Sequence, residues 1–480
     1  MADIAPPQAD NAPGLERAFP DAAPELDTPL HSTGGSLPPA LRGVYYVNGP
    51  ARFGRGGQRY DHWLDGDGMV AALRIAEGTA HLVGRYVRST KLVAEEAAGK
   101  PLFRAFGTAF PHDRLQHGLA LASPVNVSAY PFDGRLLAFG EQGLPWALDP
   151  KTLETLGEYT FGGKLKAISP FSAHPAIDPE NGELFNFGVS FSSENPALNI
   201  YRFSANGASH YRVRHRLPYP CSVHDFGLTD NHCVFHLSPY LLDMAPLQKE
   251  GRHLMDCLAW RPELGSSIWI CDRQDGRLRH QVPVGNGYCL HLIHCHERDG
   301  HLHADIIEMA EPVYDQYQVP ELFPDVRKAA IKRYSIDLQS GRLIYETTMA
   351  SNLMCDFPAL DPRTGLSDYD SLWTLGLGAT DKPGRKFFNC LLRHDWRQLG
   401  LVDRYDAPTG CYLGGEPVFL PDPDRPGEGY TLCQQFDAGE GVMEFLLFNA
   451  YDLAPGPVAR LQLDEPIHLG FHAFWNPERD

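Results

Sequence analysis

Short turn signals recur along this chain and limit the folds that it can adopt. Each places a glycine after Asp, Asn or Ser between two apolar runs: Asp133-Gly134, Asn181-Gly182, Asn206-Gly207, Asp275-Gly276, Asp299-Gly300 and Ser340-Gly341. An Asp-Gly or Asn-Gly pair suits a type I′ hairpin turn, whose two central residues both need positive φ. Many short strands at hairpin spacing predict an all-β sandwich, barrel or propeller. The length of 480 residues favours the propeller, because its four-stranded blades need a long chain.

Helical periodicity is rare in the rest of the pattern. The better candidates for helices are residues 91–100 and parts of 239–257. The 46 glycines and 40 prolines are spread without a linker-like break, which favours one large domain. We therefore expect a flexible or strap-like tail over residues 1–30, which are rich in Pro, Ala and Asp, and a single β-propeller domain over residues 31–480.

Charge and cysteine usage exclude several classes of protein. The formal net charge of −18 argues against binding of nucleic acid, which needs a basic surface. Ten cysteines without a Cys-x-x-Cys pair argue against a zinc ribbon or a disulfide scaffold. The chain starts without a secretory signal pattern and has no apolar run of membrane-spanning length, so we expect a cytoplasmic protein. Peripheral membrane contact stays open, because it needs only an apolar patch, and the oligomeric state has no signal.

Four histidines lie in short β-like segments that are far apart in the sequence: His174, His224, His291 and His472. Separate strands could bring them together if they converge on one point, as the blades of a propeller converge on an axis. Neutral imidazole is a good ligand for iron, copper, zinc and nickel. These positions therefore predict a redox-capable metal centre.

The segment around the third histidine leaves an alternative open. Side chains alternate between the two faces of a strand, so His291 shares a face with Ile293 and Cys295, whereas His294 and His296 share the other. Both sets cannot line one metal site. Periodicity alone favours His294 and His296 as a same-face pair, for example for zinc, and most of the 21 histidines must have other roles.

Three acids lie in unusually apolar surroundings: Glu141, Asp356 and Glu416. Histidine ligands usually donate their second N–H to a carboxylate or a carbonyl, which these acids could supply. The alternative is that they cap turns. The segment Asp65-Gly-Asp-Gly68 resembles part of a calcium loop but lacks its remaining ligand spacing, so a tight turn is expected there. The chain has no nucleophile elbow, phosphate loop or dinucleotide fingerprint, which weakens hydrolase and nucleotide-dependent functions.

Seven segments together resemble the carotenoid cleavage oxygenase family and cover residues 35–475 in family order. They are Gly43-Val-Tyr-Tyr-Val-Asn-Gly-Pro50, Leu64-Asp-Gly-Asp-Gly-Met69, Leu144-Pro-Trp-Ala-Leu-Asp-Pro150, Phe171-Ser-Ala-His-Pro175, Val223-His-Asp-Phe226, Glu416-Pro-Val-Phe419 and Gly470-Phe-His472. Most are short, but jointly they are specific.

The resemblance implies a seven-bladed β-propeller catalytic domain with a helical and loop cap over its top face. It implies one Fe²⁺ per chain on the propeller axis, held by His174, His224, His291 and His472. It selects His291, because His294 aligns with an Asn of the family. It also implies that Glu141, Asp356 and Glu416 orient the ligand histidines.

Departures from the family pattern concern the acids and the substrate tunnel. Asp356 replaces the usual Glu, and its shorter arm must reach a histidine through a backbone shift or through water. Leu290 stands where a Phe is common, and Asn126-Val127-Ser128 replaces Asn-Thr-Asn. The lignostilbene-cleaving branch has a phenol-binding Lys and Tyr where this chain has Gly140 and Phe106. By the resemblance, we expect the tunnel to be lined by Phe106, Val127, Phe171, Leu290 and Phe471.

The resemblance further implies an Fe(II) dioxygenase that cleaves a C=C bond of a lipophilic polyene, with O₂ as co-substrate and two carbonyl products. No side chain beyond the metal centre is expected to be catalytic. A carotenoid or apocarotenoid is the expected substrate, and a stilbenoid or phenylpropanoid aryl-alkene is the alternative. An isomerase like that of the family's visual-cycle branch and a non-catalytic propeller that binds an apolar ligand are the remaining hypotheses.

Overall fold

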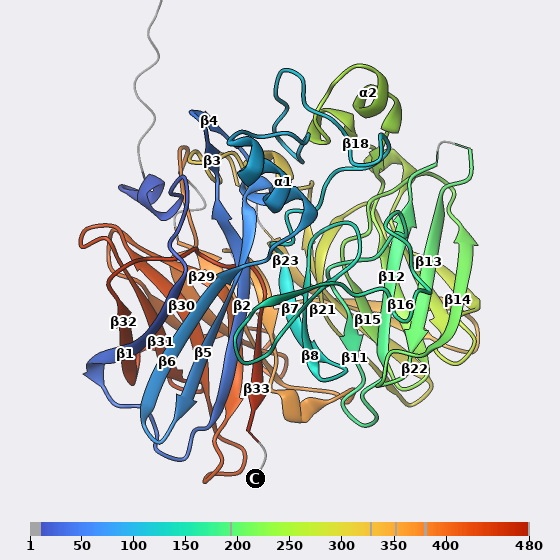
Figure 1. Cartoon of the computed structure of the whole chain (residues 1–480). Helices are drawn as coiled ribbons and strands as arrows, with labels where there is room; N and C mark the ends of the chain where they lie inside the picture. The colour runs from blue at the N-terminus through green and yellow to red at the C-terminus, as the bar shows by residue number, and fades with distance from the viewer. Residues whose placement is uncertain (1–10, 193, 327–328, 351–352, 379–381, 479–480) are drawn as a thin grey trace, which may run out of the picture.

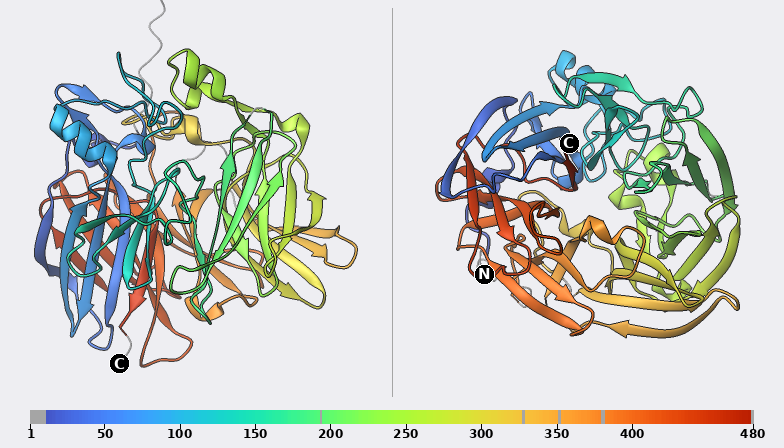
Figure 2. Two further views of the ribbon diagram at one scale, coloured as in Figure 1. Left: turned by 45° about the vertical axis from the view of Figure 1, so that its right-hand side comes forward. Right: turned by 90° about the horizontal axis from the view of Figure 1, so that it is seen from below.

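The computed structural model describes residues 11–192, 194–326, 329–350, 353–378 and 382–478. In this part of the chain the fold is all-β, with two short α-helices and six 3₁₀ turns. Viewed along its axis, the chain runs once around a ring of antiparallel sheets, so that its first and last strands belong to the same sheet (Figure 2).

Five sheets of the ring have four strands each. Their strands, sheet by sheet, are β7 (Ser128–Phe132), β8 (Arg135–Phe139), β9 (Trp146–Leu148) and β10 (Thr155–Glu158); β11 (Ala176–Ile177), β12 (Leu184–Ser190), β13 (Ala197–Phe203) and β14 (Ser209–Arg216); β15 (Phe226–Leu228), β16 (His232–Leu237), β19 (Ser267–Asp272) and β20 (Leu278–Pro283); β21 (Tyr288–Arg298), β22 (His301–Met309), β23 (Ala329–Asp337) and β24 (Arg342–Thr348); β25 (Met354–Ala359), β26 (Ser371–Leu377), β27 (Cys390–Asp395) and β28 (Gly400–Asp406).

The sixth sheet closes the ring and has nine strands. In spatial order they are β29 (Cys411–Pro421), β30 (Gly429–Asp437), β31 (Val442–Asn449), β32 (Ala459–Leu463), β1 (Leu26–Gly35), β6 (Thr79–Tyr86), β5 (Asp67–Ala76), β2 (Gly43–Arg52) and β33 (Ala473–Pro477). The expected count of seven separate blades is therefore wrong: five four-stranded blades are separate. The physical reason is β1, which pairs with β32 on one side and β6 on the other and so makes the rest one continuous sheet.

Strands at the inner edges of the sheets surround the axis and carry the candidate site. Five consecutive pairs of inner strands are in contact, from β15 with β21 through β25, β29 and β33 to β7. Strands between the inner and outer edges are buried on both faces, as in β2, whereas the outer strand β14 alternates between exposed and partly buried residues. Stacking of neighbouring sheets thus provides the hydrophobic core, and polar groups on inner strands are enclosed by it.

The turn chemistry predicted from the sequence is confirmed at its clearest positions. Asp133 and Gly134 join β7 to β8 with φ of 51° and 71°, and Asp299 and Gly300 join β21 to β22 with φ of 52° and 77°. The other four pairs also lie between consecutive strands of one sheet, but in each of them only the glycine has positive φ, so the expectation of two such residues is wrong there. The helix predicted over 91–100 is α1 (Thr90–Ala98), capped by the side chain of Ser89.

Helices and long connections gather over one end of the ring, opposite the hairpins at the lower end (Figure 1). They comprise α1, α2 (Met244–Lys249), the two-stranded sheets β3–β4 (Gly54–Arg55, Gln58–Arg59) and β17–β18 (Tyr240–Leu242, Leu258–Trp260), and the 3₁₀ turns η1 (Leu15–Ala18), η2 (Trp63–Asp65), η3 (Met255–Cys257), η4 (Pro262–Leu264) and η5 (Tyr314–Gln316). The sixth 3₁₀ turn, η6 (Pro362–Thr364), joins β25 to β26 at the lower end. No helix among the described residues is long and apolar enough to cross a membrane.

The first 30 residues divide into parts with different surroundings. Residues 1–10 of the predicted tail lie outside the described residues. Ala12, Leu15, Ala18 and Phe19 are buried, and Phe19 contacts Trp63 and Phe387 edge to face. From Leu26 onward the chain forms β1, so the segment from 11 onward is packed against the ring.

Candidate metal centre

The structure brings the four predicted histidines together on the axis of the ring. His174 and His224 each lie two residues before an inner strand, β11 or β15, His472 lies immediately before β33, and His291 lies within β21. All four are buried, and one ligand atom from each lies within 4.8 Å of those of the others. The centroid of the His174 ring lies 4.3 Å from that of His224 and 4.4 Å from that of His472. In the described part of the chain, no other group of three or more His, Cys, Asp or Glu side chains has this geometry.

The three predicted acids each face the outer nitrogen, Nδ1, of one of these histidines. The distances are 3.2 Å from Glu141 Oε2 to His224, 2.6 Å from Asp356 Oδ1 to His291 and 3.4 Å from Glu416 Oε2 to His472. An Nδ1–H that donates to a carboxylate leaves Nε2 as the lone-pair nitrogen. Nε2 of His174 and Nε2 of His291 are buried without a hydrogen-bond partner. These four rings therefore fit a metal ion that prefers imidazole nitrogen.

Interruptions in the strand ladders aim these side chains at the axis. In β21 the pairing with β22 shifts register between Cys289 and Leu292, on either side of His291. The pairing of β25 shifts after Asp356, and that of β29 shifts between Gly414 and Val418, around Glu416. Such bulges bend a strand and re-aim a side chain. The shorter Asp356 accordingly reaches His291 directly, through the backbone shift and without an intervening water.

His294 and His296 point away from the centre. Their surroundings do not support the alternative prediction of a metal site built on these two histidines. Their rings stack on one another at 5.8 Å, and His296 also stacks on His303 at 4.8 Å. His294 Nε2 bonds to the carbonyl of Ser367 at 2.8 Å. These two histidines thus share a face of β21 that His291 does not share.

Burial and neighbouring charge set the protonation of the four rings. Burial and the three nearby imidazoles hold the pKa of His174 well below its ordinary value, which keeps it in the neutral, ligating form. Burial lowers the pKa of His291 too, but the carboxylate of Asp356 outweighs it and raises that pKa to about 9. A metal at Nε2 of His291 must therefore displace a proton. Burial raises the pKa of Glu141, but its contact with His224 leaves the pKa below the ordinary value.

Two residues next to the centre were missed by the sequence reasoning. Asp225 directly follows His224, yet its Oδ1 lies 3.6 Å from Nδ1 of His174. The hydroxyl of Tyr314, in η5 of the cap, lies 3.2 Å from Nδ1 of His224. Asp225 stands inside the motif Val223-His-Asp-Phe226, but nothing in the sequence connects it to His174, and no sequence signal connects Tyr314 to a histidine 90 residues away.

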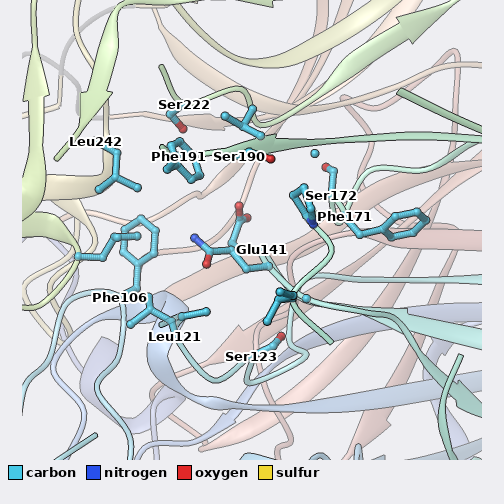
Figure 3. A pocket seen from close by; sticks show the side chains of 18 of the residues that line it. Phe106, Leu121, Ser123, Glu141, Phe171, Ser172, Ser190, Phe191, Ser222 and Leu242 are labelled. Atoms are coloured by element: carbon cyan, nitrogen blue, oxygen red, sulfur yellow. The ribbon is translucent and has the colours of Figure 1, made fainter. Parts of the chain in front are cut away.

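A cavity of about 280 Å³ opens beside His224 between the cap and the ring. Its wall includes Glu141 and Tyr314 next to His224, and Phe106 and Phe171 of the predicted tunnel. Figure 3 shows Glu141 between the ring of Phe106 and a wall that carries Ser172, Ser190 and Ser222. The other three predicted tunnel residues are buried in hydrophobic clusters and not part of this wall: Val127, Leu290 and Phe471.

The two positions that bind a phenol in the lignostilbene branch differ here for steric and chemical reasons. A Cβ at Gly140 would lie 2.2 Å from Oγ of Ser123 and 3.1 Å from the backbone nitrogen of Val125. A lysine there would require the hydroxyl of Ser123 to turn away and the backbone at Val125 to shift slightly. Phe106 packs against Tyr314 at 5.1 Å and His62 at 5.2 Å, and its ring carries no hydroxyl.

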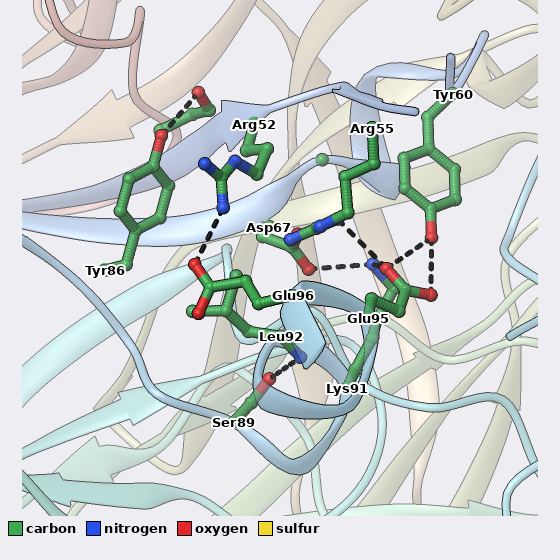
Figure 4. Close-up of polar contacts among 12 residues, drawn as sticks. Arg52, Arg55, Tyr60, Asp67, Tyr86, Ser89, Lys91, Leu92, Glu95 and Glu96 are labelled. Atoms are coloured by element: carbon green, nitrogen blue, oxygen red, sulfur yellow. Dashed lines mark hydrogen bonds and ion pairs between the residues drawn. The ribbon is translucent and has the colours of Figure 1, made fainter. Parts of the chain in front are cut away.

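A second buried polar cluster lies next to the cap and includes part of the predicted calcium-like segment. Lys91 of α1 bonds to Asp67 at 2.7 Å and to Glu95 at 3.2 Å, Arg55 pairs with the same two acids, and Tyr60 donates to Glu95 (Figure 4). Asp65 instead accepts hydrogen bonds from the backbone of residues 106 and 107 and from the hydroxyl of residue 108. Both acids of this segment thus bond to the chain itself.

Comparison with known proteins places this ring and its histidines in a family. Residues 19–477 match the model of the family described as retinal pigment epithelial membrane protein. Isoeugenol monooxygenase from Pseudomonas nitroreducens is 26% identical over 92% of this chain and 93% of its own length. Apocarotenoid-15,15'-oxygenase from Synechocystis is 28% identical over 96% of this chain and 95% of its own length.

A solved structure supports the same fold. The cobalt-substituted apocarotenoid oxygenase of Synechocystis superposes with a TM-score of 0.88 at 24% identity, over 98% of this chain and all of that one. A ring of sheets that brings four buried histidines together defines the class of protein, a β-propeller with a four-histidine metal centre. This chain belongs to the retinal pigment epithelial membrane protein family, and the resemblance to carotenoid cleavage oxygenases is confirmed.

Proposed function

We propose that this protein is an Fe(II)-dependent dioxygenase that cleaves a C=C bond of a lipophilic alkene into two carbonyl products. The observation that carries the proposal is the set of four buried imidazoles, each with its outer nitrogen facing a carboxylate, beside a cavity of about 280 Å³. His174, His224, His291 and His472 would hold one Fe²⁺ through Nε2. Bound iron supplies the activation of O₂ that an alkene needs.

The chain's own residues would hold the metal ligands and keep the reaction away from water. Glu141, Asp356 and Glu416 fix the tautomers of three histidines, so that Nε2 is the free nitrogen. Glu141 also lines the cavity, so one acid borders both the metal centre and the substrate space. Phe106, Phe171 and Tyr314 present ring surfaces on which a conjugated substrate can pack. No side chain is needed as a nucleophile.

We also propose that residues 31–480 work as one catalytic domain with the iron on the axis of its ring. The two edge strands of the nine-stranded sheet, β29 and β33, both belong to the inner set around that axis, which supports a single domain.

For the substrate we propose a carotenoid or an apocarotenoid. By the resemblance, Gly140 and Phe106 stand where the lignostilbene branch has a phenol-binding lysine and tyrosine, and neither can make such a polar contact. The similarity to the Synechocystis apocarotenoid oxygenase over nearly the whole chain supports this choice.

An aryl-alkene is the second candidate, and the size of the cavity favours it. Ligand pockets commonly measure about 300–1,000 Å³, so about 280 Å³ suits a compact substrate better than a long polyene. The similarity to isoeugenol monooxygenase points in the same direction. A long polyene would have to extend past the open side of this cavity.

The test is O₂ uptake and product mass spectrometry with Fe(II)-loaded protein and a panel of carotenoids, apocarotenals, resveratrol and isoeugenol. We expect O₂ consumption with an apocarotenal and two carbonyl fragments whose masses locate the cleaved bond. The variant His291→Ala serves as the control. Cleavage of resveratrol or isoeugenol with apocarotenals ignored would reverse the substrate choice. A product of unchanged mass would indicate an isomerase, and no O₂ uptake with any substrate would refute the dioxygenase.

A further inference from the structure

We propose that Asp225 is a positioning residue of the metal centre, a fourth carboxylate that orients His174 and ties three ligand-bearing segments together. This inference rests on the proposed function, since it concerns the same four histidines. Three of them have an acid from a distant part of the chain behind Nδ1. None of these three acids faces His174. The acid that faces its Nδ1 is Asp225, which directly follows a different ligand, His224.

The backbone holds the carboxylate of Asp225 in a fixed position. Its Oδ2 accepts the N–H of Leu292 at 2.9 Å, and its Oδ1 accepts the N–H of Phe226 at 2.7 Å. Leu292 directly follows the ligand His291, and Asp225 itself directly follows the ligand His224. One side chain thus connects the segments of two ligands before it faces a third.

The contact with His174 has the right atoms for tautomer control. Oδ1 of Asp225 lies 3.6 Å from Nδ1 of His174, a distance for electrostatic attraction and beyond that of a direct hydrogen bond. Nε2 of the same ring is buried and has no hydrogen-bond partner. A carboxylate beside Nδ1 favours the Nδ1–H tautomer, which leaves the lone pair of Nε2 for a metal. Positive charge at Nε2 would make the Nδ1–H more acidic and strengthen the attraction to Asp225.

The backbone contacts also give Asp225 a mechanical role. The pairing of β21 is interrupted on both sides of Leu292, so the sheet itself holds this part of the strand less firmly. The bond from Leu292 to Asp225 anchors the strand at that point. A change at Asp225 should therefore disturb the geometry at His174 and at His291 together.

The variant Asp225→Asn tests the tautomer argument, with Co²⁺ as the probe. An amide presents no negative charge to His174, and its single oxygen can accept only one of the two backbone N–H groups that bind Asp225. Loss of a carboxylate behind a ligand histidine typically weakens metal binding about 10–100-fold. We expect a Co²⁺ dissociation constant larger by that factor and a changed visible spectrum of bound Co²⁺. A wild-type constant and spectrum would overturn the proposal.

A double-mutant cycle separates positioning from a general structural effect. In metal-free protein, Asp225→Asn should lower the free energy of unfolding less in a His174→Ala background than it does alone, because the residue through which it acts is gone. Equal effects in both backgrounds would overturn the role through His174. As a matched control, Asp305→Asn removes another fully buried carboxylate, which pairs with Arg333 away from the centre, and should leave the Co²⁺ constant unchanged.

A measurement on the unmodified protein keeps the proposal testable if a variant does not fold. Nitrogen NMR of the metal-free wild-type protein distinguishes the two tautomers of each histidine. We expect the proton of His174 on Nδ1, and a proton on Nε2 would overturn the proposal. If wild-type protein binds no Co²⁺ at all, the metal-dependent function fails as a whole. Binding that Asp225→Asn leaves intact removes this inference alone.

Discussion

The metal centre and the cluster around Lys91 are both buried sets of polar side chains, but they are satisfied in different ways. In the Lys91 cluster the chain supplies both signs of charge, because Arg55 and Lys91 neutralise Asp67 and Glu95. In the centre the chain supplies imidazoles with carboxylates behind them and no basic side chain between the rings. A buried polar group is costly unless it is paired. The first cluster is therefore complete as a structural element, whereas the second has the composition of a binding site for a cation.

The largest expected effect is loss of metal from the variant His291→Ala. Removing one of four converging ligands should lower the iron content from about one per chain to near zero. His294→Ala is the matched control, because it lies three residues away on the same strand and points elsewhere. Metal analysis of the two purified variants is the measurement. Retention of iron by His291→Ala together with loss from His294→Ala would mean that the wrong set of histidines was chosen.

In the Lys91 cluster, the corresponding change affects stability and not metal content. Lys91→Met leaves Asp67 and Glu95 buried with a single cation, and breaking such a pair typically costs about 3–5 kcal/mol. Chemical denaturation should show this loss, while iron per folded chain stays at the wild-type level. Lys100→Met, at an exposed position, is the control and should change stability little. A Lys91→Met protein that folds with wild-type stability would show that this cluster does not need its own cation.

Adding metal should stabilise the protein through the centre alone. A ligand present at 100 times its dissociation constant stabilises the folded state by about 2.7 kcal/mol. Thermal unfolding with and without Co²⁺ should show this gain in wild-type protein and in Lys91→Met. The gain should vanish in His291→Ala. An equal gain in all three proteins would place the bound metal outside the four histidines.

The three acids behind the histidines should differ in importance according to their distances. Asp356 lies closest to its histidine, at 2.6 Å, and Glu416 lies farthest, at 3.4 Å. We expect Asp356→Asn to weaken metal binding toward the upper end of the usual range of about 10–100-fold, and Glu416→Gln toward the lower end. Titration with Co²⁺ gives both constants. The reverse order would show that these distances do not govern the support of the ligands.

The smallest expected effect concerns His62, a buried histidine outside both clusters. Its Nε2 bonds to the carbonyl of Tyr314, its Nδ1 accepts the N–H of Leu64, and burial lowers its pKa to about 4. An unfolded histidine has a pKa of about 6.5. Between these values the unfolded chain binds a proton that the folded chain does not, so stability is lost as pH falls from about 6.5 toward 4.

At pH 5.5 this loss amounts to about 1 kcal/mol. Denaturant unfolding at pH 7.5 and 5.5 should show a smaller difference for His62→Gln than for wild type in metal-free protein. Because both nitrogens of His62 bond to the backbone, Co²⁺ should not alter this part of the pH dependence. An unchanged pH dependence in His62→Gln would mean that His62 does not contribute to it.

Features that depend on residues next to one another in the sequence could be predicted from it. The hairpins at Asp133-Gly134 and Asp299-Gly300 follow from backbone preferences of the turn residues themselves, and both were predicted. The choice of His291 over His294 and His296 could not come from periodicity, because strand bulges break the two-residue alternation. Alignment with the family pattern selected His291.

Features that depend on contacts through space were missed or miscounted. The pairing of β1 with β6 and β32 joins parts of the chain more than 370 residues apart, and it changed the number of separate blades. Asp225 lies next to His224 in the sequence, but its carboxylate faces a histidine from another sheet. Nothing in the sequence indicates that Asp225 faces His174.

The closing strands also determine when a metal centre can exist during synthesis. His472 lies directly before β33, and β33 is held in place by pairing with β2 near the other end of the chain. A growing chain can therefore present three of the four histidines long before the fourth is made. Closing so large a loop is slow compared with forming local hairpins. Iron that arrives before His472 is made would meet an incomplete site, so loading should follow ring closure.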